Sequence, residues 1–157
     1  MEKLTREGLI GKLEERGLKI TPQRLAIVDV LVEKGYLHPG AKLIYREARR
    51  RTRNVSLSTV YATLGEFVQQ GIIKNLEFDR MENRCEVTLE EHINLVCRRC
   101  GKITDFHLPP SIEPGDIARR VGFTVTDARM EYYGYCRDCV SDREDFPGKR
   151  KRQGRKG

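Results

Sequence analysis

Hydrophobic residues recur at helical spacing through the first half of the chain and predict three helices. The first begins at Thr21, whose hydroxyl suits a helix N-cap, has Pro22 in its first turn and ends at Gly35. The second spans about 41–51. The third spans about 58–70, and its apolar residues at i, i+4, i+7 and i+8 are Val60, Leu64, Phe67 and Val68. This third pattern is the strongest helical signal in the sequence.

After the third helix the hydrophobic pattern becomes that of short strands. Residues 72–78 and 84–88 predict two strands joined by the polar segment 79–83, which together form a hairpin. Two helices at a short turn, the second capped by a pair of hydroxyls and followed by a hairpin, are the layout of a winged helix-turn-helix. An ordinary small helical domain with a β-hairpin would give the same pattern.

The second half of the chain predicts a small α/β unit. Short strands are expected at 93–96, 103–106 and 123–126, a helix near 111–121 and a last strand near 129–133. The predicted fold class is therefore α+β, with a winged-helix domain over 1–88 and an α/β domain over 89–140. The basic segment 141–157 has almost nothing to bury and is predicted to be a disordered tail.

Charge is distributed unevenly along the chain. Residues 1–88 hold 16 basic and 12 acidic side chains, a net charge of +4, whereas residues 89–148 hold 8 and 11, a net charge of −3. The asymmetry predicts a DNA-facing first half and a second half that faces something else. An arginine cluster beside the third helix suits phosphate contacts, although a solvated basic helix face would look the same: Arg46, Arg49, Arg50, Arg51 and Arg53.

The N-terminal sequence carries charges every few residues, so it offers no apolar signal-peptide core, and no run of membrane-spanning length follows. We therefore expect a cytoplasmic protein without a membrane partner. The chain has five cysteines, and an odd number without a secretion signal argues against a disulfide framework. Thiols that stay reduced are available to bind metals.

Four of the five cysteines form two C-x2-C pairs, Cys97 with Cys100 and Cys136 with Cys139. Four thiolates suit tetrahedral zinc and leave no open position, so the predicted ion is structural and not catalytic. A redox pair, buried free thiols and an iron–sulfur cluster are the alternatives. The remaining cysteine, Cys85, is expected to pack in the core; its neighbour Glu86 also allows a redox-tuned sensor.

A second set of metal-ligating residues comprises His38, Glu86, His92 and Asp105, with Asn94 and His107 nearby. His92 and Asn94 share a strand face by period two, as do Asp105 and His107, so paired ligands can point into one cavity. Nitrogen and carboxylate ligands suit Fe(II), Mn(II), Co(II) or Zn(II). Surface histidines and solvated acids would have the same spacing.

Several motifs in their order resemble the ferric uptake regulator (Fur) family, from about Leu9 to Cys139. They are Gly17-Leu18-Lys19-Ile20-Thr21-Pro22-Gln23-Arg24, His38-Pro39, Ile44-Tyr45, Ser58-Thr59-Val60-Tyr61, Leu64, Gly71-Ile72-Ile73 and Cys97-x2-Cys100-Gly101-Lys102-Ile103. The resemblance implies a winged-helix domain, an α/β dimerisation domain, a four-cysteine zinc site and a sensing metal between the domains.

Carried over by position, the resemblance places the sensing metal at His38, Glu86, His92 and Asp105, with His107 as a further ligand choice. Asn94 stands where the family usually has another histidine. Asp105 and its neighbours resemble the peroxide-sensing branch, whereas Glu86 resembles the iron-sensing branch, so the branch is open. Glu91 and Ala128 occupy histidine positions of an auxiliary metal site, which the resemblance therefore implies is absent.

The resemblance also implies which residues contact DNA. Tyr61, on the helix that begins with Ser58 and Thr59, would contact bases, while Lys19 and Arg24 place the first helices on the phosphate backbone. Ala62 stands where many members have arginine or asparagine. From the residues alone, Tyr61 could instead pack in the core.

These features predict a non-enzymatic, metal-dependent DNA-binding repressor. A second divalent metal, Fe(II), Mn(II) or Zn(II), would fix the angle between the domains, so that a homodimer fits a palindromic operator when metal is plentiful. The main alternative is a constitutive zinc-stabilised nucleic-acid-binding protein without metal sensing. A metal-dependent hydrolase is disfavoured, because the sequence offers no general base beside the ligands and no nucleophile motif.

Overall fold

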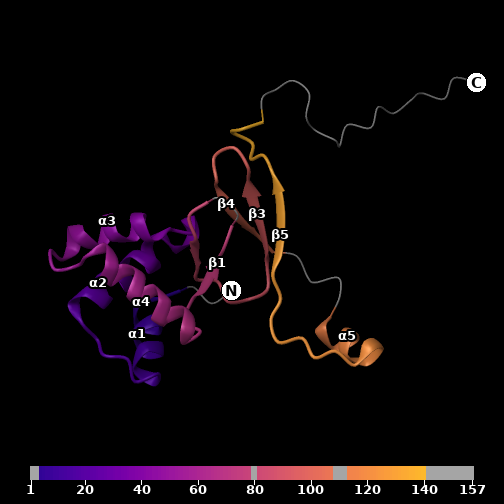
Figure 1. Cartoon of the computed structure of the whole chain (residues 1–157), viewed down its shortest axis with the longest axis horizontal. Helices are drawn as coiled ribbons and strands as arrows, with labels where there is room; N and C mark the ends of the chain where they lie inside the picture. Colours follow the sequence, from indigo (N-terminus) through magenta and orange to yellow (C-terminus); the bar gives the residue numbers. More distant parts are fainter. Residues whose placement is uncertain (1–3, 79–80, 108–112, 141–157) are drawn as a thin grey trace, which may run out of the picture.

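The computed structural model describes residues 4–78, 81–107 and 113–140. Figure 1 shows helices α1–α4 gathered on one side of the molecule and a three-stranded sheet on the other. The helices are α1 (Arg6–Glu15), α2 (Pro22–Lys34), α3 (Ala41–Arg51), α4 (Leu57–Gln69) and α5 (Pro114–Val121), with a 3-10 turn η1 (Gly35–Leu37). The strands are β1 (Lys74–Leu76), β2 (Arg84–Glu86), β3 (Ile93–Cys97), β4 (Ile103–Phe106) and β5 (Met130–Gly134).

Helices α1–α4 enclose the main hydrophobic core. Its largest fully buried side chains include Leu9, Leu13, Ile27, Leu31, Ile44 and Phe67. The sequence predicted α2, α3 and α4 but not α1, whose few apolar residues lie among charged ones. Two of those, Leu9 and Leu13, lie four residues apart on one face, and both are completely buried.

The predicted start of the third helix needs a correction. Thr21 caps α2 as expected, because its hydroxyl accepts a hydrogen bond from the backbone N–H of Arg24. α4 begins at Leu57, one residue before the predicted Ser58, and its cap is Ser56. The Ser56 hydroxyl accepts from the backbone N–H of Thr59 at 3.1 Å, so Ser58 and Thr59 lie inside the first turn.

The hairpin after α4 is confirmed, but its strands are shorter than predicted. β1 and β2 pair antiparallel, with Lys74 opposite Glu86. Ile72 and Ile73 are both buried, instead of alternating between a buried and an exposed side chain as in a strand. Their backbone N–H groups donate to the carbonyl of Phe67, which folds the chain back against α4. The strand β2 also bridges Gly40 through Arg84, which ties this hairpin, the wing, to the start of α3.

The second sheet has the strand order β4-β3-β5, in which β3 pairs antiparallel with β4 and parallel with β5. The prediction of a strand at 123–126 is wrong. Residues 122–129 connect α5 to β5 without regular structure, and Phe123 is exposed, so nothing in the described chain supplies the cross-strand partners that a strand requires. The helix predicted at 111–121 is confirmed over Pro114–Val121; residues 111 and 112 lie outside the described part.

The tail predicted at 141–157 also lies outside the described residues, and the domain boundary after residue 88 stays a prediction. α5 contributes no buried residue, although its polar and apolar side chains are segregated. Among the residues that the structure describes, no helix is long and apolar enough to cross a membrane.

Candidate metal centres

Four cysteine sulfurs converge at one end of the second sheet. Cys97 ends β3 and Cys136 follows β5, and the parallel register that places Cys97 opposite Gly134 brings the two pairs together. Each pair lies in a tight turn, with Cys97 O accepting from Gly101 N and Cys136 O accepting from Cys139 N, both at 2.9 Å. The four sulfurs lie within 4.8 Å of one another. The structure therefore brings together the set that the spacing predicted.

The electrostatics of this cluster suit a bound cation. Backbone N–H groups of Cys100 and Cys136 stabilise the thiolate of Cys97 and lower its pKa to about 6. Burial and hydrogen bonds to the neighbouring thiols raise the pKa of Cys139 to about 12. Four adjacent sulfurs cannot all carry negative charge without a compensating ion, whereas Zn(II) with four thiolate ligands satisfies them. The donor set thus fits structural zinc.

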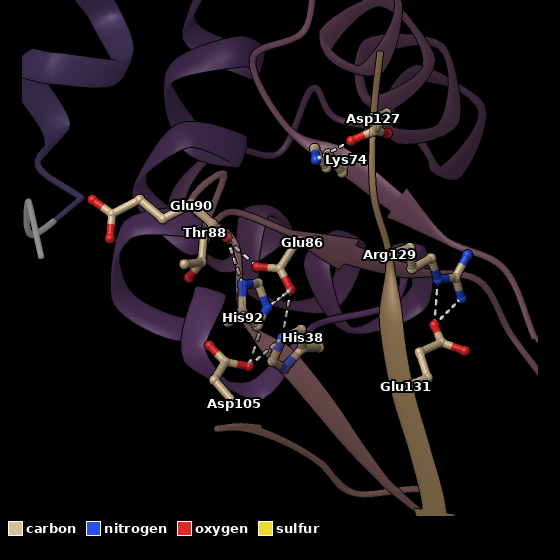
Figure 2. Close-up of polar contacts among 10 residues, drawn as sticks. All are labelled: His38, Lys74, Glu86, Thr88, Glu90, His92, Asp105, Asp127, Arg129 and Glu131. Carbon is tan, nitrogen blue, oxygen red and sulfur yellow. Dashed lines mark hydrogen bonds and ion pairs between the residues drawn. The ribbon is translucent and has the colours of Figure 1, made fainter. Parts of the chain in front are cut away.

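The second cluster lies where the helices meet the two sheets (Figure 2). His38 follows η1, Glu86 ends β2, His92 precedes β3 and Asp105 lies in β4. Their ligand atoms also lie within 4.8 Å of one another. Nε2 of His38 is 3.0 Å from Glu86 Oε2 and 2.9 Å from Asp105 Oδ1. Nε2 of His92 is 3.0 Å from the same Glu86 oxygen and 3.9 Å from Asp105 Oδ1.

Local backbone structure orients these side chains toward the centre of the cluster. His38 adopts a left-handed conformation, with φ of 48°, which turns the chain between η1 and α3. His92 Nδ1 lies 2.8 Å from the carbonyl of Glu90 and donates to it, so Nε2 is the ring nitrogen that faces Glu86 and would bind a metal. Glu86 accepts from the backbone N–H of Thr88 at 2.7 Å through its other oxygen.

The cluster is buried and electrostatically polarised. His38 is 1% exposed, and Glu86 and His92 are also buried. Burial alone would lower the pKa of His38, but hydrogen bonds to Asp105 and Glu86 outweigh it and raise that pKa to about 9. Burial would raise the pKa of Glu86, and the contact with His38 lowers it instead. The carboxylates of Asp105 and Glu86 thus favour the positively charged form of the His38 imidazole. A divalent cation at the same place would be bound by these same side chains.

The two further predicted ligands lie beside this group. Asn94 is 4% exposed, and its Oδ1 has no hydrogen-bond partner among the described residues. His107 is exposed and stacks on His92 with ring centroids 5.7 Å apart, outside the group of four converging ligands. Cys85 lies in the helical core, where burial raises its pKa to about 12, so the prediction of a packing role is confirmed.

The residues predicted to contact DNA lie on or beside α4. Tyr61 is 52% exposed and is therefore not a core residue, and Ser58 and Lys19 are exposed as well. Arg24 differs, because its guanidinium donates to the carbonyl of Lys19 at 2.9 Å and pairs with Glu66 of α4. Arg24 thus braces the loop before α2 against α4.

The predicted arginine cluster on α3 is largely paired within the protein. Glu47, which is buried, contacts Arg46 and Arg50, and Lys34 of α2 lies 2.9 Å from the same carboxylate. Arg51 pairs with Glu33 of α2. The pairs Arg51–Glu33 and Lys34–Glu47 join α2 to α3, whereas Arg46 and Arg50 pair within α3 and keep that surface basic.

Sequence reasoning missed the contacts that join the wing to the second sheet. Lys74 Nζ lies 2.8 Å from Asp127 Oδ1. Arg129 donates to the carbonyl of Glu77 at 3.0 Å, and its guanidinium lies 5.5 Å from the ring centroid of Phe78. No local signal reveals such pairs, because their members are about fifty residues apart and one acceptor is a backbone carbonyl. The contact between His92 and the carbonyl of Glu90 was not predicted either, because that acceptor is also a backbone carbonyl.

Comparisons with known proteins agree with this arrangement. The model of the ferric uptake regulator family matches residues 15–133. The peroxide-responsive repressor PerR of Staphylococcus epidermidis is 38% identical over 137 residues, covering 87% of this chain and 91% of that protein. The peroxide operon regulator of Bacillus subtilis is 39% identical over 128 residues, covering 81% and 88%.

A solved structure of the ferric uptake regulator Fur of Helicobacter pylori, described as having three functional metal-binding sites, superposes with a TM-score of 0.73. It is 28% identical, and the match covers 91% of this chain and all of that one. With the winged helix, the four-cysteine cluster and the second ligand cluster, these matches establish the family. The chain belongs to the ferric uptake regulator family of metal-dependent transcriptional repressors.

Proposed function

We propose that His38, Glu86, His92 and Asp105 hold the regulatory ion, and that its binding fixes the wing and helices relative to the second sheet. The observation that carries the proposal is the origin of the four ligands. His38 and Glu86 belong to the side that contains the helices and the wing, whereas His92 and Asp105 flank and form the sheet of β3, β4 and β5. Ligands from both sides make ion binding depend on their relative position.

The donor set supports Fe(II), Mn(II) or Zn(II) as the regulatory ion. Two imidazoles and two carboxylates are intermediate in softness, and their preference among first-row ions follows availability in the cell as well as affinity. A bound divalent ion would neutralise both carboxylates and would replace the proton that they favour on His38 in its absence. Asn94 offers an amide oxygen toward the same site, and His107 supports the ring of His92 by stacking.

We infer that α4 enters the major groove of DNA with Tyr61 and Ser58 facing the bases. The exposure of both residues supports this placement, and Thr59 lies in the same first turns of the helix. Lys19 would reach a phosphate from the loop before α2. Arg24 contributes by holding that loop and α4 together through Glu66, so its replacement would disturb the shape of this surface.

The operator is proposed to be palindromic, because the second half of the chain offers a surface for a second copy. β5 pairs with β3 along one edge only within the described chain. The exposed apolar residues near this edge and on α5 include Val121, Phe123, Tyr132 and Tyr135. A two-fold dimer through this surface would present two copies of α4 to successive half-sites.

Contacts across the two sides support a defined closed arrangement. Arg129, next to β5, bonds to the wing at Glu77 and Phe78, and Lys74 of β1 pairs with Asp127. We call these three contacts the clasp. The clasp and the proposed ion both connect the wing side to the second sheet. Formation of the clasp would therefore strengthen ion binding, and ion binding would strengthen the clasp.

The test is DNA binding by the zinc-loaded dimer with and without added Mn(II). Wild type is compared with His38→Ala and His92→Ala, and Thr104→Ala serves as a matched control because Thr104 is exposed on β4 beside Asp105 and is not one of the converging ligands. We expect Mn(II) to tighten binding to a palindromic operator in wild type and in the control but not in the first two variants. Equal binding in all samples would leave a constitutive DNA-binding protein.

The names of the staphylococcal and Bacillus relatives support peroxide as a second signal. The corresponding test treats Fe(II)-loaded and Mn(II)-loaded protein with hydrogen peroxide and then measures operator binding. Loss of binding in the Fe(II) sample alone supports a peroxide response. Unchanged binding in both samples refutes it and leaves metal supply as the signal.

A further inference from the structure

A cleft of about 640 Å³ leads from solvent to the proposed sensing ligands. It lies between β1, the segment before β3 and the connection from α5 to β5. Glu86, His92 and Asn94 line its buried end, while the exposed residues Glu90 and Glu91 line its outer part. Two of the four proposed ligands of the regulatory ion are therefore reached through this cleft.

The charge of the cleft is predominantly acidic. Its basic side chains are both engaged, because Lys74 pairs with Asp127 and Arg129 pairs with Glu131 and the carbonyl of Glu77. The carboxylates of Glu90 and Glu91 have no ion-pair partner among the described residues. The mouth of the cleft thus carries uncompensated negative charge, with the Glu90 carboxylate directed away from Glu86 and His92 (Figure 2), and this charge attracts cations more strongly than the overall positive charge of the chain would suggest.

Asn94 provides a second and independent indication of a ligand. The cleft is lined by His92 and Asn94 but not by Ile93 or Leu95, so alternation along β3 turns the Asn94 side chain toward the cleft. Its Oδ1 is buried without a hydrogen-bond partner within the described chain. A buried amide oxygen in that state is costly unless it meets a donor or a cation.

We propose that this cleft is the route by which a divalent cation reaches the sensing ligands, with Glu90 and Glu91 attracting the ion outside and Asn94 Oδ1 coordinating it within. The inference rests on the proposed function, because the destination of the ion is the cluster of His38, Glu86, His92 and Asp105. Attraction of this kind acts mainly on the association rate and weakens as salt screens the carboxylates.

The test measures association and dissociation rates of Co(II) with the zinc-loaded dimer by stopped-flow absorbance at low and high ionic strength. The variant Glu90→Gln/Glu91→Gln removes both charges without changing side-chain size. Its matched control is Glu14→Gln/Glu15→Gln, which changes two adjacent glutamates on the distant helix α1. We expect the association rate of the first variant to fall about tenfold at low salt, by roughly threefold for each carboxylate, and to become less salt-dependent.

Asn94 is tested separately through Asn94→Leu and Asn94→Asp, which remove the oxygen or add charge at similar size. The leucine variant should bind Co(II) several-fold more slowly and more weakly, and the aspartate variant at least as fast and as tightly as wild type. The route is refuted if the glutamine double variant associates at the wild-type rate, if the α1 control slows equally, or if Asn94→Leu binds as wild type does. Retention of Co(II) binding by His92→Ala would instead refute the proposed sensing site itself.

Discussion

Replacing Arg129 with alanine should weaken the clasp between the wing and the second sheet without disturbing either piece. Arg129 is 38% exposed and reaches the wing through a hydrogen bond to Glu77 O and a cation–π contact with Phe78. Its pairing with Glu131 lies within its own piece and does not join the two sides. Only the first two contacts are therefore lost from the closed arrangement.

The size of the effect follows from these two contacts. A hydrogen bond from a charged donor contributes about 1 kcal/mol when it is partly solvated, and an exposed cation–π contact contributes about 0.5–1 kcal/mol. Their loss would destabilise the closed arrangement by about 1.5 kcal/mol, which corresponds to a factor of about ten in its equilibrium constant. Because the proposed ligands span both pieces, affinity for the regulatory ion should fall by up to the same factor.

The assay is a competition titration of Mn(II) binding to the zinc-loaded dimer, combined with operator binding at a fixed Mn(II) concentration. Arg98→Ala is a suitable control, because Arg98 lies 5.6 Å from the ring centroid of Tyr133 and both belong to the second piece. It removes a similar arginine–aromatic contact without crossing between the pieces. We expect Mn(II) affinity to fall about threefold to tenfold in Arg129→Ala and to stay within twofold of wild type in the control.

Unchanged Mn(II) affinity and unchanged operator binding in Arg129→Ala would refute this reasoning. That result would mean that the clasp does not determine how the ligands come together. Equal losses in both variants would also refute it, because the effect would then arise inside the sheet. Circular dichroism of both variants checks that neither has lost its secondary structure.

Four further measurements test other features of the structure. Cys136→Ser should abolish zinc retention and dimer formation while the helical core persists, as seen by metal analysis, sedimentation and circular dichroism; full zinc retention would contradict the four-cysteine site. Without regulatory metal, the raised pKa of His38, about 9 against 6.5 unperturbed, stabilises the fold fully below pH 6.5. That contribution should disappear as pH rises toward 9, so thermal melts should show a decline that His38→Ala lacks. Phe67→Ala should cost about 3–5 kcal/mol in urea unfolding, and Val68→Ala, at a more exposed site, under about 1 kcal/mol. Tyr61→Ala should weaken operator binding without lowering the melting temperature, and equal affinity would exclude a base contact.

Local signals predicted much of the helical half. Thr21 and the apolar spacing of α4 determine helices through interactions within a few residues, and both helices lie where the sequence placed them. The four-cysteine set could be recognised because the two cysteines of each pair, Cys97 with Cys100 and Cys136 with Cys139, lie in one tight turn. The prediction failed at α1, where packing of Leu9 and Leu13 against other helices outweighs a weak local pattern.

Other features depend on distant segments and could not be read from local sequence. The proposed strand at 123–126 had suitable residues, but the described chain gives it no neighbouring strand. The convergence of His38 with Asp105 joins residues 67 positions apart; the sequence offered both as candidate ligands, but only the family resemblance assigned them to one metal site. The access cleft and the clasp depend on how the two sides pack, for which no motif exists.

The short connection after η1 links the two proposed metal ligands on the wing side, His38 and Glu86. His38 is followed by Pro39, whose carbonyl accepts from Cys85 N at 3.0 Å, directly beside Glu86. Gly40 then bridges β2 and begins α3, where Glu82 of the wing accepts from the backbone N–H of Lys42 at 3.1 Å.

A Cβ at Gly40 would lie 2.5 Å from the Glu82 carboxyl carbon, so the end of the Glu82 side chain lies directly against this joint between wing and helix. His38 and Glu86 are consequently held in one rigid piece with α3, and α3 packs against α4. The proposed ion, shared with His92 and Asp105, would act between this piece and the second sheet. The structure therefore favours rotation of intact recognition helices over a change in their shape as the way in which metal alters DNA binding.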